Sequence, residues 1–367
     1  MRRISFHGES DHITALTTLQ AQSSGDSKKN VFTDRRITAF ALPETHLRGI
    51  ISGVPVICAI FTHFNSRERT LTCLSRLAQQ TCRPQHVVII NNGSADDPTL
   101  AEANSFASET FPTGTLHILQ MESNLGNAGG CARGLEYAFG TLKADFTWVL
   151  DDDSWPRPRT LENLLAVEVD ADTVRMSAVI DPAKGDELSW PLTISGGSPD
   201  RWKNAICRNE LPAGNIIPSR GGWLGALYPR AAWLKAGLPT EALFIRGEDE
   251  EYPWKVREAG FSFITVLNSE LEHPSAGTPL IHYRIAHRSF FYEPGLPISR
   301  QYYKSRNWAW LQRLRAPRNY PRRLVACAFY IILSLNAMLK SNELSIPRIY
   351  NLFRALHNGF YGKLRPF

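Results

Sequence analysis

The stretch VPVICAIFTHF at residues 54–64 decides the fold, because it is almost continuously apolar and rich in β-branched residues. Such a run is typical of a strand that is covered on both faces, as strands are in a parallel sheet. Residues 67–80 follow with apolar side chains at helical spacing, which predicts a helix. The same alternation of strand and helix continues along the chain. We therefore expect an α/β fold with a mostly parallel, Rossmann-like sheet and helices on both of its faces.

Polar side chains are expected to gather at one edge of this sheet. In α/β sheets of this kind, ligands bind at the carboxyl ends of the strands. Thr62, Asn91 and Asp151 each fall at such an end. The remaining predicted elements are strands at residues 86–90, 116–120, 146–150 and 261–267, and helices at residues 98–106, 129–142 and 254–260.

The two ends of the chain differ from this alternating region. Residues 1–52 hold short alternating stretches that favour a small β segment, and no apolar run follows the basic start, so we expect no signal peptide. Residues 301–367 are predicted to form a helical tail that is rich in aromatic and basic side chains. The expected domains are therefore residues 1–52, 53–300 and 301–367, and the second carries the sheet.

The formal net charge of +6 is spread unevenly, since the tail carries a net charge of +11 and the rest of the chain −5. The tail contains 12 Lys or Arg residues and a single acid, Glu343. Its longest apolar run, residues 324–339, is shorter than the roughly 20 residues that a membrane-spanning helix needs. Aromatic and basic side chains together favour a helix that lies on an anionic membrane surface, rather than one that binds nucleic acid. A solvated basic face, or a helix packed on the main domain or on another subunit, is the alternative.

The cysteines give no sign of a disulfide framework or a zinc site. None of the six forms a CxxC pair, and several lie within apolar stretches, where a free thiol behaves as a small hydrophobic side chain. Free thiols suit a reducing compartment. We therefore expect a cytoplasmic protein that lies peripherally on the inner face of the cell membrane.

Three carboxylates, Asp151, Asp152 and Asp153, follow the apolar strand at residues 146–150. Like charges in a row repel one another, so such a cluster does not serve stability. Carboxylate oxygens bind hard cations such as Mg²⁺ and Mn²⁺. In an extended segment Asp151 and Asp153 share a side and can face one cation, which could neutralise a departing diphosphate. The alternative is an acidic cluster that favours the start of the next helix.

Residues 124–134 read NLGNAGGCARG and open a predicted helix. Small residues let a ligand approach the backbone, and the free N–H groups of a helix start favour phosphate, with Arg133 as a further donor. The segment is neither a dinucleotide-binding nor a Walker motif.

Asn91 begins an Asn-Asn-Gly-Ser turn that could hydrogen-bond a base, and Thr62 is placed to do the same. For each of these loops an ordinary turn is the alternative.

A second acidic cluster, Glu-Asp-Glu-Glu at residues 248–251, lies just before a predicted helix. Its carboxylates could supply a general base, or they could only favour the helix start. His273 follows the strand at residues 261–267 and could complete a cation site with the earlier carboxylates. A lone histidine is more often not a ligand, and His282 and His287 are rivals for this role.

Together these motifs resemble the family-2 glycosyltransferases, which have the GT-A fold. The matching segments, in chain order, are residues 61–65, 91–94, 124–133 and 148–153. The resemblance extends over residues 54–275, and the helical tail is similar to the variable end of the family. Within the family, residues 222–230 and 243–252 look most like the corresponding segments of bacterial galactofuranosyltransferases and rhamnosyltransferases.

The resemblance implies a role for each candidate residue. Asp249, the second acid of a pair, is implied as the catalytic base. The implied metal ligands are Asp151, Asp153 and His273, the implied donor contacts are Thr62, Asn91, Asn124, Arg133 and Asp152, and the implied acceptor contacts are Trp223 and Glu248. Asn91, Glu248 and Gly247 stand where the family often has Asp, Asp and Trp, so the donor sugar and the acceptor stay open.

The implied reaction is an inverting, metal-dependent transfer of a sugar from a nucleoside diphosphate to a glycan or a lipid-linked glycan, with Mn²⁺ or Mg²⁺ as the cofactor. Galactofuranose from a UDP-linked donor is favoured, and rhamnose from dTDP-rhamnose is the alternative. A nucleotidyltransferase has a similar sheet and metal, but few basic residues follow the first strand here. A non-catalytic glycan-binding protein on the same fold is also open, as is the oligomeric state.

Overall fold

The computed structural model describes residues 55–198, 201–275, 279–285 and 288–367. The unit described below is Val54–Phe367. The β segment that is predicted within residues 1–52 lies outside the described residues.

The secondary structure alternates between strands and helices over its first half and becomes helical at the end. The strands are β1 (Ile57–His63), β2 (His86–Asn91), β3 (Leu116–Gln120), β4 (Phe146–Val149), β5 (Trp155–Pro156), β6 (Thr173–Asp181), β7 (Glu187–Leu188), β8 (Leu192–Ser198), β9 (Arg201–Ala205), β10 (Ile216–Pro218), β11 (Ala226–Pro229), β12 (Ser262–Glu272), β13 (Ile281–Ile285) and β14 (Arg288–Tyr292). The α-helices are α1 (Arg67–Ala78), α2 (Pro98–Thr110), α3 (Gly126–Glu136), α4 (Thr160–Leu165), α5 (Arg230–Ala236), α6 (Glu248–Glu258), α7 (Ile298–Arg315), α8 (Tyr320–Lys340) and α9 (Ile346–Phe360).

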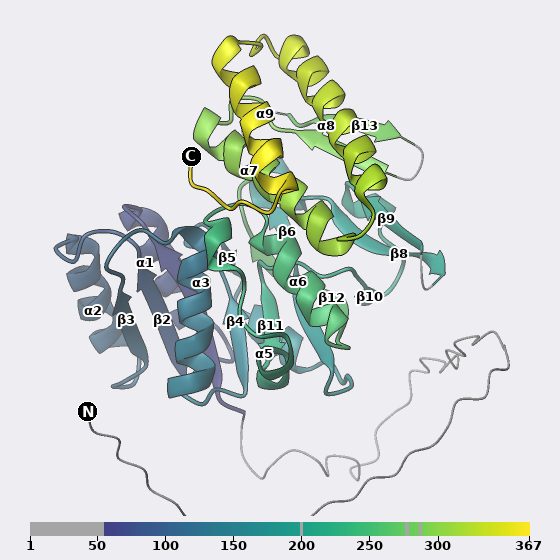
Figure 1. Cartoon of the computed structure of the whole chain (residues 1–367). Helices are drawn as coiled ribbons and strands as arrows, with labels where there is room; N and C mark the ends of the chain where they lie inside the picture. Colours follow the sequence, from purple (N-terminus) through teal and green to yellow (C-terminus); the bar gives the residue numbers. More distant parts are fainter. Residues whose placement is uncertain (1–54, 199–200, 276–278, 286–287) are drawn as a thin grey trace, which may run out of the picture. The chain divides into compact units, whose positions relative to one another are not determined.

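A ten-stranded sheet forms the centre of the unit (Figure 1). Along its main path the strand order is β10-β12-β6-β11-β4-β1-β2-β3, while β5 pairs with β12 and β7 pairs with β6. β1 lies parallel to β2 and β4, β2 to β3, and β6 to β12. On this path only β10 and β11 run antiparallel to their neighbours. The predicted mostly parallel α/β sheet is therefore confirmed, although β6, β10 and β11 were not among the predicted strands.

Both faces of the sheet are covered by helices, as its apolar central strands require. Along β1, Ile57, Ala59 and Phe61 point into one apolar core, which also takes in buried side chains of α1, α2 and α4. Cys58 and Ile60 point into a second core on the opposite face, with side chains of α3, α5 and α6. The strict alternation explains why the sequence of β1 is apolar throughout.

Several elements start or end at other positions than the sequence predicts, and α3, α6 and β12 show this most clearly. α3 begins at Gly126, three residues earlier, and passes into a π-helical turn, η1 (Tyr137–Thr141). α6 begins at Glu248, six residues earlier, because the acidic cluster forms its first turn, where negative charge is favoured by the helix dipole. β12 continues to Glu272, five residues later, through a shift of register against β6.

The C-terminal helices α7, α8 and α9 lie together at the top of Figure 1 and share an apolar core with the β13–β14 hairpin. α8 has 21 residues and a mean hydropathy of 1.5, so it is long and apolar enough to cross a membrane by length and composition alone. One third of that apolar window, 33%, is buried inside the protein. The helix exceeds the apolar run at residues 324–339 because it extends beyond this run at both ends.

Candidate active site

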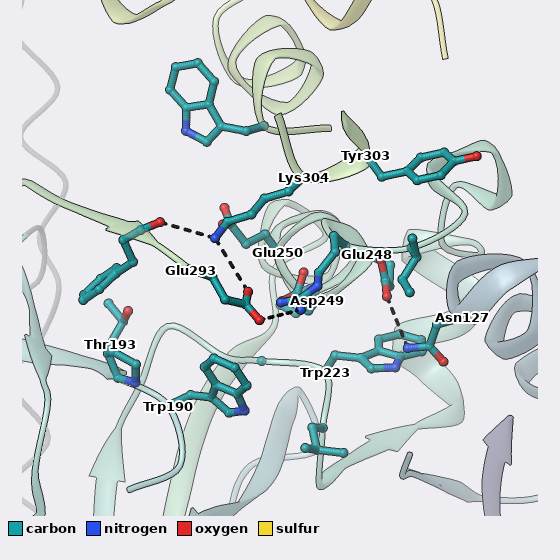
Figure 2. A pocket seen from close by; sticks show the side chains of 18 of the residues that line it. Asn127, Trp190, Thr193, Trp223, Glu248, Asp249, Glu250, Glu293, Tyr303 and Lys304 are labelled. Atoms are coloured by element: carbon teal, nitrogen blue, oxygen red, sulfur yellow. Dashed lines mark hydrogen bonds and ion pairs between the residues drawn. The ribbon is translucent and has the colours of Figure 1, made fainter. Parts of the chain in front are cut away.

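A large open cleft lies at the carboxyl ends of the parallel strands, between the sheet and the C-terminal helices. The end of strand β1 contributes Thr62 to its walls, and the loops after β2 and β4 contribute Asn92 and Asp151. His273 enters from the end of β12. The start of α6 forms part of the cleft, and α7 and α8 line its far side. Figure 2 shows Asn127 and Glu248 on one side of this cleft, and Lys304 and Glu293 on the other.

Asp151, Asp153 and His273 are brought together from two strands that are distant in sequence. One ligand atom from each of the three lies within 4.8 Å of the other two. His273 Nε2 is 3.4 Å from Asp153 Oδ1. The backbone N–H of His273 donates to Ile180 over 2.9 Å, so the pairing of β12 with β6 fixes the position of the imidazole. Two carboxylates and an imidazole form a donor set that fits a divalent cation.

The titration of this group reflects its crowded negative charge. Burial and the neighbouring Asp153 raise the pKa of Asp151 to about 7. Burial opposes the charge of Asp153 as well, but the hydrogen bond from His273 and the nearby Arg69 bring the pKa of Asp153 below its ordinary value. Burial also disfavours a charged His273, yet its contact with Asp153 raises the pKa of the imidazole overall. The group therefore attracts protons that a bound divalent cation would displace.

Two side chains at the start of α1 hold the neighbouring carboxylates. The hydroxyl of Ser66 donates a hydrogen bond to Asp152, and Arg69 Nη1 lies 3.1 Å from Asp153 Oδ2. Burial raises the pKa of Asp152, and the hydrogen bond from Ser66 opposes this rise. The sequence alone predicts no role for either residue, because nothing in it indicates that α1 begins beside the loop after β4.

Asp151, Asp153 and His273 are called the metal-type group below. Asn127 links this group to the second acidic cluster, and the sequence alone predicts no role for it. Its Oδ1 accepts a hydrogen bond from the hydroxyl of Thr62 over 3.0 Å. This contact turns the donating Nδ2 toward Glu248 Oε1, 3.2 Å away, and toward Asp151 Oδ1, 3.4 Å away. The glycine-rich segment was a visible signal, but the partners of Asn127 lie up to 121 residues away in the sequence.

The two acids at the start of α6 have different surroundings. Glu248 is only 4% exposed, and burial together with the adjacent Asp249 raises the pKa of Glu248 to about 8. Asp249 is open to the cleft, and its Oδ1 accepts a hydrogen bond of 2.9 Å from the N–H of Gly247. Enclosure by the cleft walls and the nearby Glu250 raise the pKa of Asp249 above its ordinary value. A neutral Glu248 therefore lies beside a carboxylate that can accept a proton from a molecule in the cleft.

The predicted donor contacts do not all reach the cleft. Thr62, Asn124 and Asp152 line it. Asn91 is buried, and its amide is occupied by Ser94, Gln120 and the N–H of Gly93, whereas its neighbour Asn92 lines the cleft. Arg133 points away from the cleft lining into ion pairs with Glu136 and Glu241, over 2.9 Å each.

Trp223 lies in the cleft wall, but most of its surface is inside the protein. It is 3% exposed, and its ring meets those of Tyr252 and Tyr228 at centroid distances of 5.4 and 6.1 Å. Trp190, on another part of the wall, lies 6.1 Å from the ring of His273. His282 stacks on Phe291 in the β13–β14 hairpin, away from the group formed by His273.

Comparison with known proteins identifies the family. The family described as Glycosyl transferase family 2 matches residues 58–224. The chain is 28% identical over 227 residues to the "Galactofuranosyltransferase GlfT1" of Mycolicibacterium smegmatis, and this match covers 60% of the chain and 71% of the relative. Residues 58–224 form a family-2 glycosyltransferase domain. The chain is therefore a glycosyltransferase enzyme, and the alternative hypotheses of a nucleotidyltransferase and of a non-catalytic binding protein are not supported.

The glycosyltransferase is also similar to other known proteins over part of its length. It is 32% identical over 106 residues to the "Amylovoran biosynthesis glycosyltransferase AmsB" of Erwinia amylovora, a match that covers 29% of the chain and 33% of the relative. Among solved structures, GalNAc-T7 with UDP, GalNAc and Mn²⁺ matches with a TM-score of 0.48 and 14% identity. That match covers 70% of the glycosyltransferase and about half, 51%, of the other chain.

Proposed function

We propose that this glycosyltransferase moves galactofuranose from a UDP-linked donor to a glycan or lipid-linked glycan, with inversion at the anomeric carbon. The observation that carries the proposal is the position of Asp249 in the same cleft as Asp151, Asp153 and His273, with Asn127 between the two groups. The galactofuranosyltransferase among the relatives favours the sugar.

Asp249 has the properties that a general base needs. Its carboxylate is open to the cleft, and its raised pKa makes it a stronger proton acceptor than an ordinary aspartate. The acceptor hydroxyl gives its proton to Asp249 as its oxygen attacks the anomeric carbon, and the bond from that carbon to the diphosphate breaks on the opposite side. A single displacement of this kind inverts the configuration and needs no covalent intermediate.

The donor is proposed to lie along the loops that follow β1 and β4. Asp151, Asp153 and His273 would hold Mn²⁺ or Mg²⁺, which when bound neutralises charge on the leaving diphosphate. Thr62 and Asn124 line the donor side of the cleft, and Asp152 is fixed there by Ser66. Contacts from Asn91 and Arg133 to the donor would require each side chain to leave its present partners.

The acceptor is proposed to occupy the opposite part of the cleft. Trp223 and Glu248 form its floor, and α7 and α8 form the far wall. Large apolar side chains are exposed on α8 and at the start of α9, namely Leu324, Val325, Phe329, Ile332, Leu339, Ile346 and Tyr350. Together with the basic residues of the tail, they support peripheral attachment to the inner face of the cell membrane, where a lipid-linked acceptor would be found. The six free cysteines fit a cytoplasmic protein.

Transfer assays and thermal denaturation with a panel of nucleotide sugars test this proposal. UDP-galactofuranose with Mn²⁺ or Mg²⁺ is expected to raise the melting temperature and to support transfer, because a ligand that binds the native state stabilises it. A response to dTDP-rhamnose instead would keep the reaction and change the sugar. No response to any donor with either cation would overturn the proposal.

A further inference from the structure

The loop just before the catalytic acids has an unusual backbone. Phe244, Arg246 and Gly247 have φ angles of 65°, 67° and 114°. Residues other than glycine rarely adopt such left-handed conformations, which persist where surrounding groups hold them. Asp249 follows two residues later and accepts a hydrogen bond from the N–H of Gly247. The conformation of this loop therefore determines where the Asp249 carboxylate lies.

The side chain of Asn307, on α7, holds the loop from one side. Asn307 is fully buried, and its Nδ2 lies 3.0 Å from the carbonyl oxygen of Leu243 and 3.1 Å from that of Ile245. It also contacts the carbonyl oxygen of Arg246. The two N–H bonds of the amide are shared among these three acceptors. Asn307 thus fixes the segment in which the backbone turns left-handed.

Arg306 decides which way the amide of Asn307 faces. Its Nε donates to Asn307 Oδ1 over 2.8 Å, so the donating Nδ2 must point toward the loop. Its Nη2 donates to the carbonyl oxygens of Ala242 and Leu243, over 2.8 and 2.9 Å. These carbonyls belong to the short helical turn η4 (Glu241–Leu243), whose end needs hydrogen-bond donors.

Burial of the Arg306 guanidinium has a large free-energy penalty, because a charged group loses its hydration. Arg306 is 1% exposed, and burial lowers the pKa of its guanidinium. Its hydrogen-bond partners in the described part of the chain are carbonyl and amide oxygens, and its guanidinium lies 4.8 Å from the centre of the Tyr303 ring. Burial of a charged group without a carboxylate partner has a desolvation penalty, so Arg306 is not expected to serve the stability of the fold alone.

The other side of the loop contacts the donor part of the cleft. The carbonyl oxygen of Phe244 accepts a hydrogen bond of 3.0 Å from the N–H of Ala128, at the start of α3. A side chain on Gly126 would collide with the same carbonyl. One loop therefore joins the glycine-rich start of α3, the first turn of α6 and helix α7 of the tail. Figure 2 shows Tyr303 and Lys304 of α7 facing the same cleft.

We propose that Asn307 and Arg306 are positioning residues for the transfer reaction. They hold residues 243–247 in the conformation that presents Asp249 to the acceptor, while Phe244 caps the glycine-rich turn on the donor side. The helical tail is thereby part of the catalytic machinery. This inference rests on the proposed function, because it acts through the proposed base.

The test compares Asn307→Ala with the wild type in steady-state transfer assays. The kcat is expected to fall about 10- to 100-fold, since a displacement of a catalytic group by about 1 Å has effects of this size. The KM for the donor is expected to change less than about threefold, because the metal-type group is untouched. Asn307→Ser keeps one hydrogen-bond donor, so its kcat is expected to lie between those of the wild type and Asn307→Ala. This variant replaces Asn307→Ala in the test if Asn307→Ala does not fold. Asn351→Ala is the matched control, because Asn351 is a tail residue that also donates to a backbone carbonyl, but to that of Pro347 in its own helix rather than to the loop.

Combination with Asp249→Asn separates positioning from stability. If Asn307 acts through Asp249, then Asn307→Ala costs no further activity in the Asp249→Asn background. An equal loss in both backgrounds, or unchanged kcat per folded molecule in Asn307→Ala and Asn307→Ser, would overturn the inference. A wild-type protein without transferase activity would overturn the proposed function and this inference with it, whereas an active wild type with equally active Asn307 variants would overturn the inference alone.

Discussion

Asn127 donates a hydrogen bond to Glu248 over 3.2 Å, and the same Nδ2 lies 3.4 Å from Asp151. The start of α3 is thus connected both to the acids of α6 and to the carboxylates after β4. The hydroxyl of Thr62 donates to the Oδ1 of Asn127 and fixes its orientation. The proposed donor and acceptor parts of the cleft therefore meet at one amide.

Asn127→Asp is expected to lower kcat/KM more than Asn127→Ala, because it places a further negative charge between two acids. A loss of about 10- to 100-fold is expected for Asn127→Ala. Steady-state transfer assays measure both. Asn163→Ala is the control, since the Asn163 amide also donates a hydrogen bond, to the carbonyl oxygen of Asn268, but lies on α4, outside the cleft lining. Equal activity of Asn127→Ala and Asn163→Ala would contradict the role given to Asn127.

Glu248 predicts a specific dependence of stability on pH. Its pKa is about 8 in the folded protein against an ordinary value of 4.5, so the folded state holds the proton over this range and the unfolded state releases it. Stability is therefore lost as pH rises from about 4.5 to about 8. Glu248→Gln removes this term, so its melting temperature is expected to exceed that of the wild type at pH 8.5 by about 2 °C or more.

The pH comparison has a simple control on the same helix. Glu258→Gln changes an exposed acid at the far end of α6 and is expected to leave the pH profile of the melting temperature as it is in the wild type. Parallel profiles for wild type and Glu248→Gln between pH 5 and 8.5 would show that Glu248 is ionised in the folded state and would contradict the account of its burial.

The metal-type group predicts cation-dependent nucleotide binding. UDP is expected to raise the melting temperature in the presence of Mn²⁺ and much less in EDTA, and Asp153→Ala and His273→Ala are each expected to abolish the difference. His282→Ala is the matched control, because His282 stacks on Phe291 in the β13–β14 hairpin. If His282→Ala loses the response to Mn²⁺, or if His273→Ala keeps it, the assignment of His273 as the imidazole ligand is contradicted.

The exposed side chains of α8 predict attachment to anionic membranes. Phe329 and Ile332 are 51% and 61% exposed, so Phe329→Glu with Ile332→Glu is expected to lower sedimentation with anionic vesicles at least about tenfold. Leu234→Glu is the control, since Leu234 is 67% exposed on α5. Unchanged sedimentation of the α8 variant would contradict attachment through this helix.

The sheet could be predicted from the sequence because its central strands are apolar on both faces, as Cys58 and Phe61 show. The start of α6 was placed too late, since an acidic cluster fits both a loop and a first helical turn. The antiparallel strand β11 was missed because four residues give little periodic signal.

Candidate site residues were predictable where a motif follows a strand, as with Asp151 and His273. The local sequence does not show side-chain orientation, so it could not place Arg133 outside the cleft lining. Contacts across the fold were also out of reach. Asn307 lies more than 60 residues after the loop that it holds, and a single sequence carries no signal for that pairing.

The central claim is that Asp249 is the base of an inverting transfer, and the most direct test is transfer from UDP-galactofuranose by the wild type and by Asp249→Asn. The wild type is expected to form a product whose anomeric configuration, measured by NMR, is opposite to that of the donor. Asp249→Asn is expected to bind UDP with Mn²⁺ as the wild type does and to transfer about 100- to 10,000-fold more slowly. A product with retained configuration, or an Asp249→Asn variant as active as the wild type, would contradict the account.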